Sequence, residues 1–164
     1  MQCCARSTAA NAACLLAAWR DRGAPILHVR HEFPTPDAPF FAANSPGAAI
    51  HDSVRPQANE PVVLKRKANS FRDTDLKDRL DALGVNRVVI CGAMSQMCID
   101  AAARAAADFG YAVTVVHDAC AARPQSFEGV DVPADHVHAT VMAALGAFYA
   151  TVRATENVWT ESGR

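Results

Sequence analysis

Cys98 is the residue of this sequence best placed to do chemistry. It follows the segment Gly92-Ala-Met-Ser-Gln-Met, which leads from an apolar run into a predicted helix. The partial positive charge and free N–H groups at a helix start favour a thiolate and can hold an oxyanion. The pattern indicates a nucleophilic cysteine. The alternative is a small packing residue in an Ala-rich helix.

Lys65 is the second candidate. It directly follows the apolar run at residues 61–64, so it would project from the carboxyl end of a strand. A cation at that edge of the sheet stabilises a neighbouring thiolate. The alternative is a solvated basic turn made by Lys65 together with Arg66 and Lys67.

Other titratable residues fit structural roles better. Asp118 follows an apolar run and is expected to cap its turn rather than line a site. His136 and His138 lie two positions apart on a predicted helix and so on different faces. No histidines show the tight spacing of a metal site, so we expect neither metal nor cofactor. The histidines considered for a metal are His28, His31 and His51.

The elements that must position these residues alternate along the chain. Such alternation predicts an α/β fold, a doubly wound parallel sheet with helices on both faces, with chemistry at the carboxyl ends of the strands. Residues 32–60, with five prolines, predict a long functional loop. We expect helices at 7–19, 74–83, 98–109 and 134–151, strands at 26–30, 61–64, 87–91 and 112–117, and an edge strand near Val152.

The length, net charge and distribution of apolar residues limit the classes of binding partner that we expect. The 164 residues fit a single domain, and a net charge of -1 without charged blocks argues against nucleic acid and membrane surfaces. No apolar run is long enough to span a bilayer, and no signal peptide is evident, so we expect a cytoplasmic protein with reduced cysteines. A small-molecule substrate is the expected partner. The wide apolar surface of residues 134–151 predicts a homo-oligomer.

The motifs together resemble the isochorismatase-like cysteine hydrolases. Residues 88–111, which include Val-Ile-Cys-Gly-Ala-Met-Ser-Gln-Met-Cys, and residues 113–121 carry the resemblance. Residues 65–71 resemble the family's lysine segment, and residues 25–31 resemble its second strand. The similarity runs from about Ala9 through nearly the whole chain. It implies a single three-layer α/β/α domain over residues 1–164.

The resemblance also implies roles for individual residues. Cys98 would be the nucleophile and Lys65 the cationic member of a catalytic triad. A cis peptide would join Ala93 to Met94 and aim backbone N–H groups at the oxyanion. The substrate pocket would be lined in part by an aromatic group near the long loop. That group is His31, Phe33, Phe40 and Phe41.

One family feature is missing from the sequence. The family's catalytic aspartate ends a first, central strand, whereas no apolar run ending in Asp precedes the helix at 7–19. We therefore expect the domain to be truncated at its N-terminus, with roughly 20 to 30 further residues upstream in the functional protein. Without that acid the thiol lacks an evident general base.

Three functions remain open at this point. The leading one is hydrolysis of an amide or related C–N bond of a small molecule through an acyl thioester on Cys98. The second is a catalytically inactive binding or assembly protein that keeps the scaffold without the base. The third is a thiol redox sensor, although no resolving cysteine is identifiable.

Overall fold

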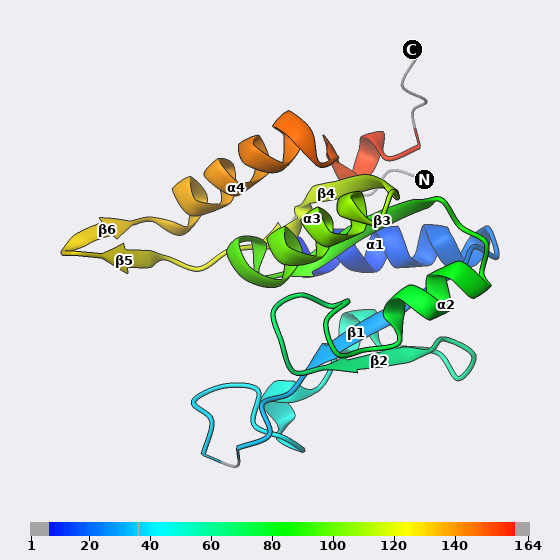
Figure 1. Ribbon diagram of the computed structural model, residues 1–164, viewed down its shortest axis with the longest axis horizontal. Coiled ribbons are helices and arrows are strands. Elements are labelled where there is room, and N and C mark those ends of the chain that lie inside the picture. The colour runs from blue at the N-terminus through cyan, green and yellow to red at the C-terminus, as the bar shows by residue number, and fades with distance from the viewer. Residues whose placement is uncertain (1–6, 36, 160–164) are drawn as a thin grey trace.

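The structure is a computed structural model that describes residues 7–35 and 37–159, and helices and strands alternate through most of it (Figure 1). The helices are α1 (Thr8–Asp21), α2 (Leu76–Ala82), α3 (Asp100–Asp108) and α4 (Ala134–Phe148). The strands are β1 (His28–His31), β2 (Val62–Lys65), β3 (Arg87–Ala93), β4 (Ala112–Ala121), β5 (Gln125–Phe127), β6 (Val130–Val132) and β7 (Thr151–Arg153).

The parallel strands lie in two groups. β1 pairs with β2, and β3, β4 and β7 pair in that order, all in parallel. Within residues 7–35 and 37–159, β1 and β3 each pair with one neighbour. No residue of β3 is fully buried, although strands of a parallel sheet are normally buried on both faces. One edge of β3 is therefore uncovered.

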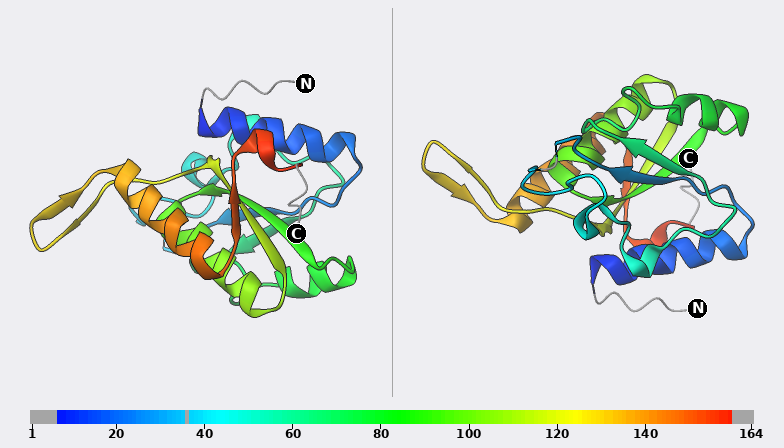
Figure 2. Two further views of the ribbon diagram at one scale, coloured as in Figure 1. Left: turned by 90° about the horizontal axis from the view of Figure 1, so that it is seen from above. Right: turned by 90° about the horizontal axis from the view of Figure 1, so that it is seen from below.

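Helices cover the two faces of the larger sheet, as the figures show (Figure 2). Residues of β4 alternate between the faces: Val115 joins a core with α3 and α4, whereas Val116 packs with Leu15 of α1. Val115 and Val116 are both fully buried. The predicted α/β class with helices on both faces is confirmed, with the sheet divided in two.

Local sequence explains most element boundaries. Ser7 caps α1, because its Oγ accepts a hydrogen bond from the N–H of Ala10 at 3.2 Å. Thr74 Oγ accepts from the N–H of Leu76 at 3.3 Å and so holds the start of α2. Gly84, with a φ of 64°, follows α2 in the left-handed conformation that glycine favours.

Two features differ from the prediction. Residues 32–60 form a long loop as expected, but with two single 3-10 turns, at Pro46–Ala48 and Asp52–Val54. The strands β5 and β6 form an unpredicted antiparallel hairpin that projects from the body (Figure 1). Each strand has three residues, which is too short for an alternating pattern to stand out.

Candidate active site

The turn between β3 and α3 holds the candidate nucleophile. Its peptide bond between Ala93 and Met94 is cis, and a π-helical turn, η3 (Ser95–Ile99), leads directly into α3. The carbonyl oxygen of Met94 accepts hydrogen bonds from the N–H groups of Met97 at 3.1 Å and Ile99 at 3.2 Å. Cys98 is a free, half-buried thiol within this turn. The turn thus presents a thiol at the start of a continuous helical segment.

A buried hydrogen bond ties this turn to α4. The hydroxyl of Ser95, which has no solvent exposure, lies 2.8 Å from Nδ1 of His138. The His138 ring faces His117 of β4, with ring centroids 6.4 Å apart. Burial, followed by the proximity of His117, lowers the pKa of His138. The ring of a neutral His138 can accept a hydrogen bond from the Ser95 hydroxyl. This hydrogen bond holds the thiol turn against α4.

Lys65 is buried at the carboxyl end of β2, with 4% of its surface exposed. Its ammonium donates to the carbonyl oxygens of Lys67 at 3.0 Å and Ala68 at 2.6 Å. The alternative of a solvated turn is therefore wrong for Lys65, although Arg66 and Lys67 are exposed. The chain folds back over the ammonium and supplies carbonyl partners.

The predicted aromatic group assembles beside Lys65. His31 is the strand partner of Lys65, and its ring lies 4.7 Å from that of Phe33 and 5.5 Å from that of Phe41. Phe40 contacts both phenylalanines at 5.5 Å. Desolvation, and then the charge of Lys65, lower the pKa of His31. Both ring nitrogens of His31 are buried and lack a hydrogen-bond partner.

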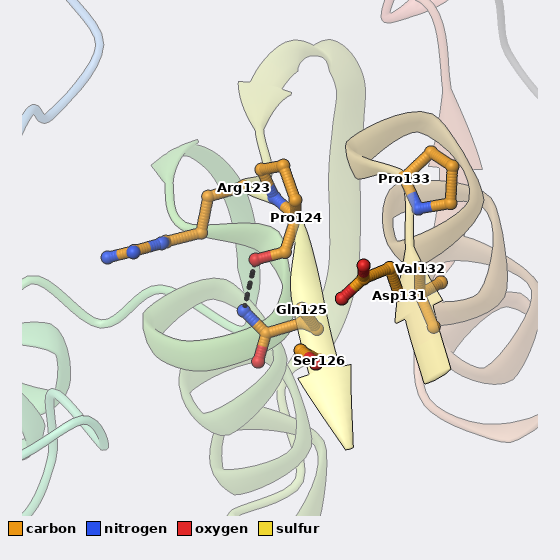
Figure 3. Close-up of a pocket in the computed structure, with 7 residues that line it drawn as sticks. All are labelled: Arg123, Pro124, Gln125, Ser126, Asp131, Val132 and Pro133. Atoms are coloured by element: carbon orange, nitrogen blue, oxygen red, sulfur yellow. Dashed lines mark hydrogen bonds between the residues drawn. The ribbon is translucent and has the colours of Figure 1, made fainter. Parts of the chain in front are cut away.

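A hollow of about 310 Å³ lies between the thiol turn, the long loop and the hairpin. Met94, Gln96 and Met97 flank Cys98 and form one wall, and Phe40 contributes another. The remaining wall comes from residues 123–126 at the base of the hairpin. The same four residues, with residues 131–133, line an adjoining hollow (Figure 3). Of the predicted pocket residues, Phe40 alone borders the hollow beside the thiol turn.

The carboxylates of Asp118 and Glu60 form hydrogen bonds and ion pairs away from Cys98 and Lys65. Asp118 lies within β4, and its Oδ1 accepts from both the N–H and the hydroxyl of Thr155 at 2.8 Å. It was expected to cap its own turn, but it instead anchors the C-terminal segment, because the strand extends through it. Glu60, whose side chain is 6% exposed, forms ion pairs with Arg20 and His28. Within residues 7–35 and 37–159, no carboxylate forms a hydrogen bond or ion pair with Cys98 or Lys65.

The other cysteines divide into three cases. Cys120 is buried as expected, and burial raises the pKa of its thiol to about 12. Cys91 was expected to be a packing residue, and it lies exposed on β3, although desolvation by its surroundings raises the pKa of its thiol to about 11. Cys14 is disulfide-bonded, so the expectation of reduced thiols is wrong there. Cys3 and Cys4 lie outside the described residues.

The described residues contain neither a metal-binding cluster nor a membrane-spanning helix. Residues 7–35 and 37–159 contain no group of three histidine, cysteine or acidic side chains able to hold a metal ion. The same residues include no helix long and apolar enough to cross a membrane.

The fold and the thiol turn define an α/β domain with a cysteine in the turn where the parallel strand β3 passes into the helix α3. The isochorismatase domain model matches residues 5–157. The chain belongs to the isochorismatase family of hydrolases. It is 49% identical to the Bacillus subtilis isochorismatase family protein YddQ over 148 residues, which is 90% of this chain and 82% of that relative.

Solved structures agree with this assignment. A crystal structure from Oleispira antarctica, assigned as an isochorismatase hydrolase, matches with a TM-score of 0.90 and 52% identity. The match covers 93% of this chain and 80% of that one. A streptothricin hydrolase from Streptomyces noursei is 37% identical over 134 residues, which is 81% of this chain and 45% of that enzyme. The chain therefore spans under half of that relative.

Sequence reasoning missed three residues around the thiol turn. Ser95 and His138 are 43 positions apart, so spacing could not reveal their contact. Arg123 borders the hollow from a hairpin that was not predicted. An arginine between the end of an apolar run and a proline is the one sequence signal that could have suggested a site residue there.

Proposed function

We propose that this protein is a cysteine hydrolase that cleaves an amide or related C–N bond of a small molecule. The Cys98 thiolate attacks the carbonyl carbon, and the C–N bond breaks as the leaving nitrogen takes a proton. Water then attacks the acyl thioester, which releases the acid and restores the thiol. The N–H groups of Met94 and Cys98 serve as donors to the oxyanion.

The observation that carries this proposal is the position of Cys98. Its thiol sits in the first turn of a helical segment that starts directly after β3; Cys98 itself does not line the adjacent hollow, but its neighbours Met94 and Met97 contribute apolar walls to it. Helix starts favour anions through their free N–H groups and dipole, and apolar walls reduce competition from water. A cysteine that serves only for packing needs neither a helix start nor an adjacent hollow. Cys120 represents that inert kind in the same fold.

Lys65 acts in this proposal as the cation of the site. Its ammonium is buried and held by two carbonyl groups, which position the charge without neutralising it. The step that deprotonates the thiol needs an acid–base group, and within residues 7–35 and 37–159 no carboxylate forms a hydrogen bond or ion pair with Cys98 or Lys65.

Related enzymes favour C–N bonds as the target. A maleamate amidohydrolase of Pseudomonas putida is 34% identical over 121 residues, which is 66% of this chain and 57% of that enzyme. The N-carbamoylsarcosine amidase of Thermoplasma acidophilum shares the fold with a TM-score of 0.78 and 25% identity. Both names describe hydrolysis of an amide-type bond.

A binding or assembly protein is the second candidate. The observation that favours it is the absence, within residues 7–35 and 37–159, of a carboxylate bound to Cys98 or Lys65. Limiting iodoacetamide near pH 6, followed by peptide mass spectrometry, separates the two functions. The reference is Cys98 in the same chain unfolded by denaturant at the same pH, because burial raises the pKa of the Cys91 thiol to about 11 and makes it a poor reference. Faster labelling of Cys98 in the folded chain than in the unfolded one supports the hydrolase, and slower labelling supports the binding protein.

A further inference from the structure

Ser95 joins the backbone of the thiol turn to a histidine of α4. Its hydroxyl, which has no solvent exposure, lies 2.8 Å from Nδ1 of His138. Its carbonyl oxygen accepts a hydrogen bond from the N–H of Asp100, so its backbone closes the helical turn that contains Cys98. A displacement of Ser95 therefore moves the N–H groups that surround the thiol.

The helix α4 gives this contact a fixed support. Met142 and Leu145 of α4 are buried in the main hydrophobic core, and Val137, which precedes His138, is buried as well. The helix contacts η3, α3 and β7. The backbone of His138 is therefore anchored, and its ring decides whether Ser95 is held.

The contact depends on the charge of the imidazole ring. A neutral ring with its proton on Nε2 accepts a hydrogen bond from the Ser95 hydroxyl at Nδ1, whereas a protonated ring has two donors and no acceptor. Within residues 7–35 and 37–159, that hydroxyl forms no other hydrogen bond. Its hydrogen would then be left without an acceptor in a place that water does not reach, which is unfavourable. Protonation of His138 therefore breaks the contact.

No carboxylate offsets a charge on His138. The titratable and charged residues on α4 and on the elements packed around it are Cys98, Asp100, Arg104, Asp108, His117, Asp118, Cys120, Asp135, His136 and Arg153. Among the described residues none of these acids forms an ion pair with His138, since Asp100 pairs with Arg104 and Asp118 accepts from Thr155. Burial, followed by the proximity of His117, lowers the pKa of His138. The ring is therefore neutral near pH 7 and gains its proton only in acid.

We propose that His138 is a positioning residue for the nucleophile and acts as a pH-sensitive latch on the thiol turn. A neutral His138 holds Ser95 and keeps the turn in the conformation in which Cys98 reacts. A protonated His138 releases Ser95, and Cys98 loses the N–H groups that stabilise its thiolate. This inference rests on the proposed role of Cys98 as nucleophile and adds the regulation of that role by pH.

The rate at which iodoacetamide alkylates Cys98 tests the latch without a substrate. Peptide mass spectrometry follows this rate in the full chain over the pH range in which circular dichroism shows the native fold. Only the thiolate reacts, so protonation of the thiol alone lowers the rate about tenfold per pH unit. If His138 must also be neutral, two protons suppress the reaction, and the fall approaches about a hundredfold per pH unit in acid. The steeper part should begin at the pKa of His138 that NMR of its ring protons measures.

Two substitutions at His138 separate the latch from a purely structural role. His138→Asn keeps an acceptor, Oδ1, near the place of Nδ1 but does not titrate. Cys98 should then react within about threefold of the wild-type rate near neutral pH, without the steeper fall in acid. His138→Leu removes the acceptor and should slow the reaction about fivefold or more at every pH. His136→Asn is the matched control, because His136 is exposed two positions earlier on the same helix, and it should keep the wild-type profile.

Each outcome decides for or against the latch. The inference is overturned by a wild-type profile without the steeper fall, by a steeper fall that persists in His138→Asn, or by its loss in His136→Asn as well. Should His138→Leu fail to fold, the profiles of the other three chains decide. A steeper fall that His138→Asn alone removes upholds the latch even in a chain that hydrolyses no amide, which would contradict only the hydrolase. Amide hydrolysis by a chain that lacks the steeper fall does the reverse.

Discussion

Ser95→Ala tests whether α4 holds the thiol turn in place. The change removes the hydroxyl 2.8 Å from His138 Nδ1 at a position with no solvent exposure, and within residues 7–35 and 37–159 no other side chain forms a hydrogen bond with it. Leaving a buried polar group unsatisfied costs about 1 to 3 kcal/mol. For a domain of this size, each kcal/mol shifts the melting temperature by about 2 to 4 °C. We therefore expect a fall of roughly 2 to 12 °C.

The chain contains a matched control for this measurement. Ser53 makes the same kind of contact, with its hydroxyl 2.8 Å from Nδ1 of His51, but both residues are exposed. Water replaces the lost bond there, so Ser53→Ala should change stability by less than about 0.5 kcal/mol. Urea unfolding followed by circular dichroism measures both variants. A Ser95→Ala variant no less stable than Ser53→Ala would refute the proposed coupling between the turn and α4.

Four further predictions concern charge and assembly. Burial lowers the pKa of His138 in the folded chain, so as the pH falls this histidine takes up its proton earlier in the unfolded chain than in the folded one. The free energy of unfolding should therefore fall below about pH 6.5, and it should fall less steeply in His138→Gln. Urea unfolding at several pH values measures both. The pKa of Glu60 is lowered to about 2, chiefly by its hydrogen bond from Arg20. Its stabilisation should be present above about pH 4.5 and lost toward pH 2, and Glu60→Gln should flatten that decline in acid unfolding. Lys65→Met leaves two carbonyl groups without their donor and should cost about 1 to 3 kcal/mol in urea unfolding. Phe148 on α4 is 90% exposed, so light scattering should show an oligomer that Phe148→Asp dissociates, and a monomer across micromolar concentrations would contradict this.

Sequence predicted the elements wherever a strong local pattern existed. The helix at 7–19 and the strand at 61–64 were placed within two residues of α1 and β2, because a cap and a continuous apolar run mark them. β4 was predicted to end at 117 but runs to Ala121. Polar His117 and Asp118 interrupt the apolar run, although backbone pairing with β3 continues past them.

The candidate site was predictable only in its local part. The thiol turn is a contiguous segment, so its residues could be recognised from their order. The contact between Ser95 and His138, and the approach of Arg123 to the turn, join segments far apart in sequence. Such pairs depend on how helices and hairpins pack over the sheet, which no spacing rule reports.

Cys98→Ser tests the central claim most directly, since it replaces sulfur by a nearly isosteric oxygen that ionises far less readily. Ammonia release from a panel of small primary amides is compared for the wild-type chain and the variant, with their circular dichroism as the control for folding. The proposed mechanism predicts that hydrolysis falls by orders of magnitude while the fold is retained, because the nucleophile of covalent catalysis is lost. A folded Cys98→Ser variant that keeps more than about a tenth of the wild-type rate would contradict it.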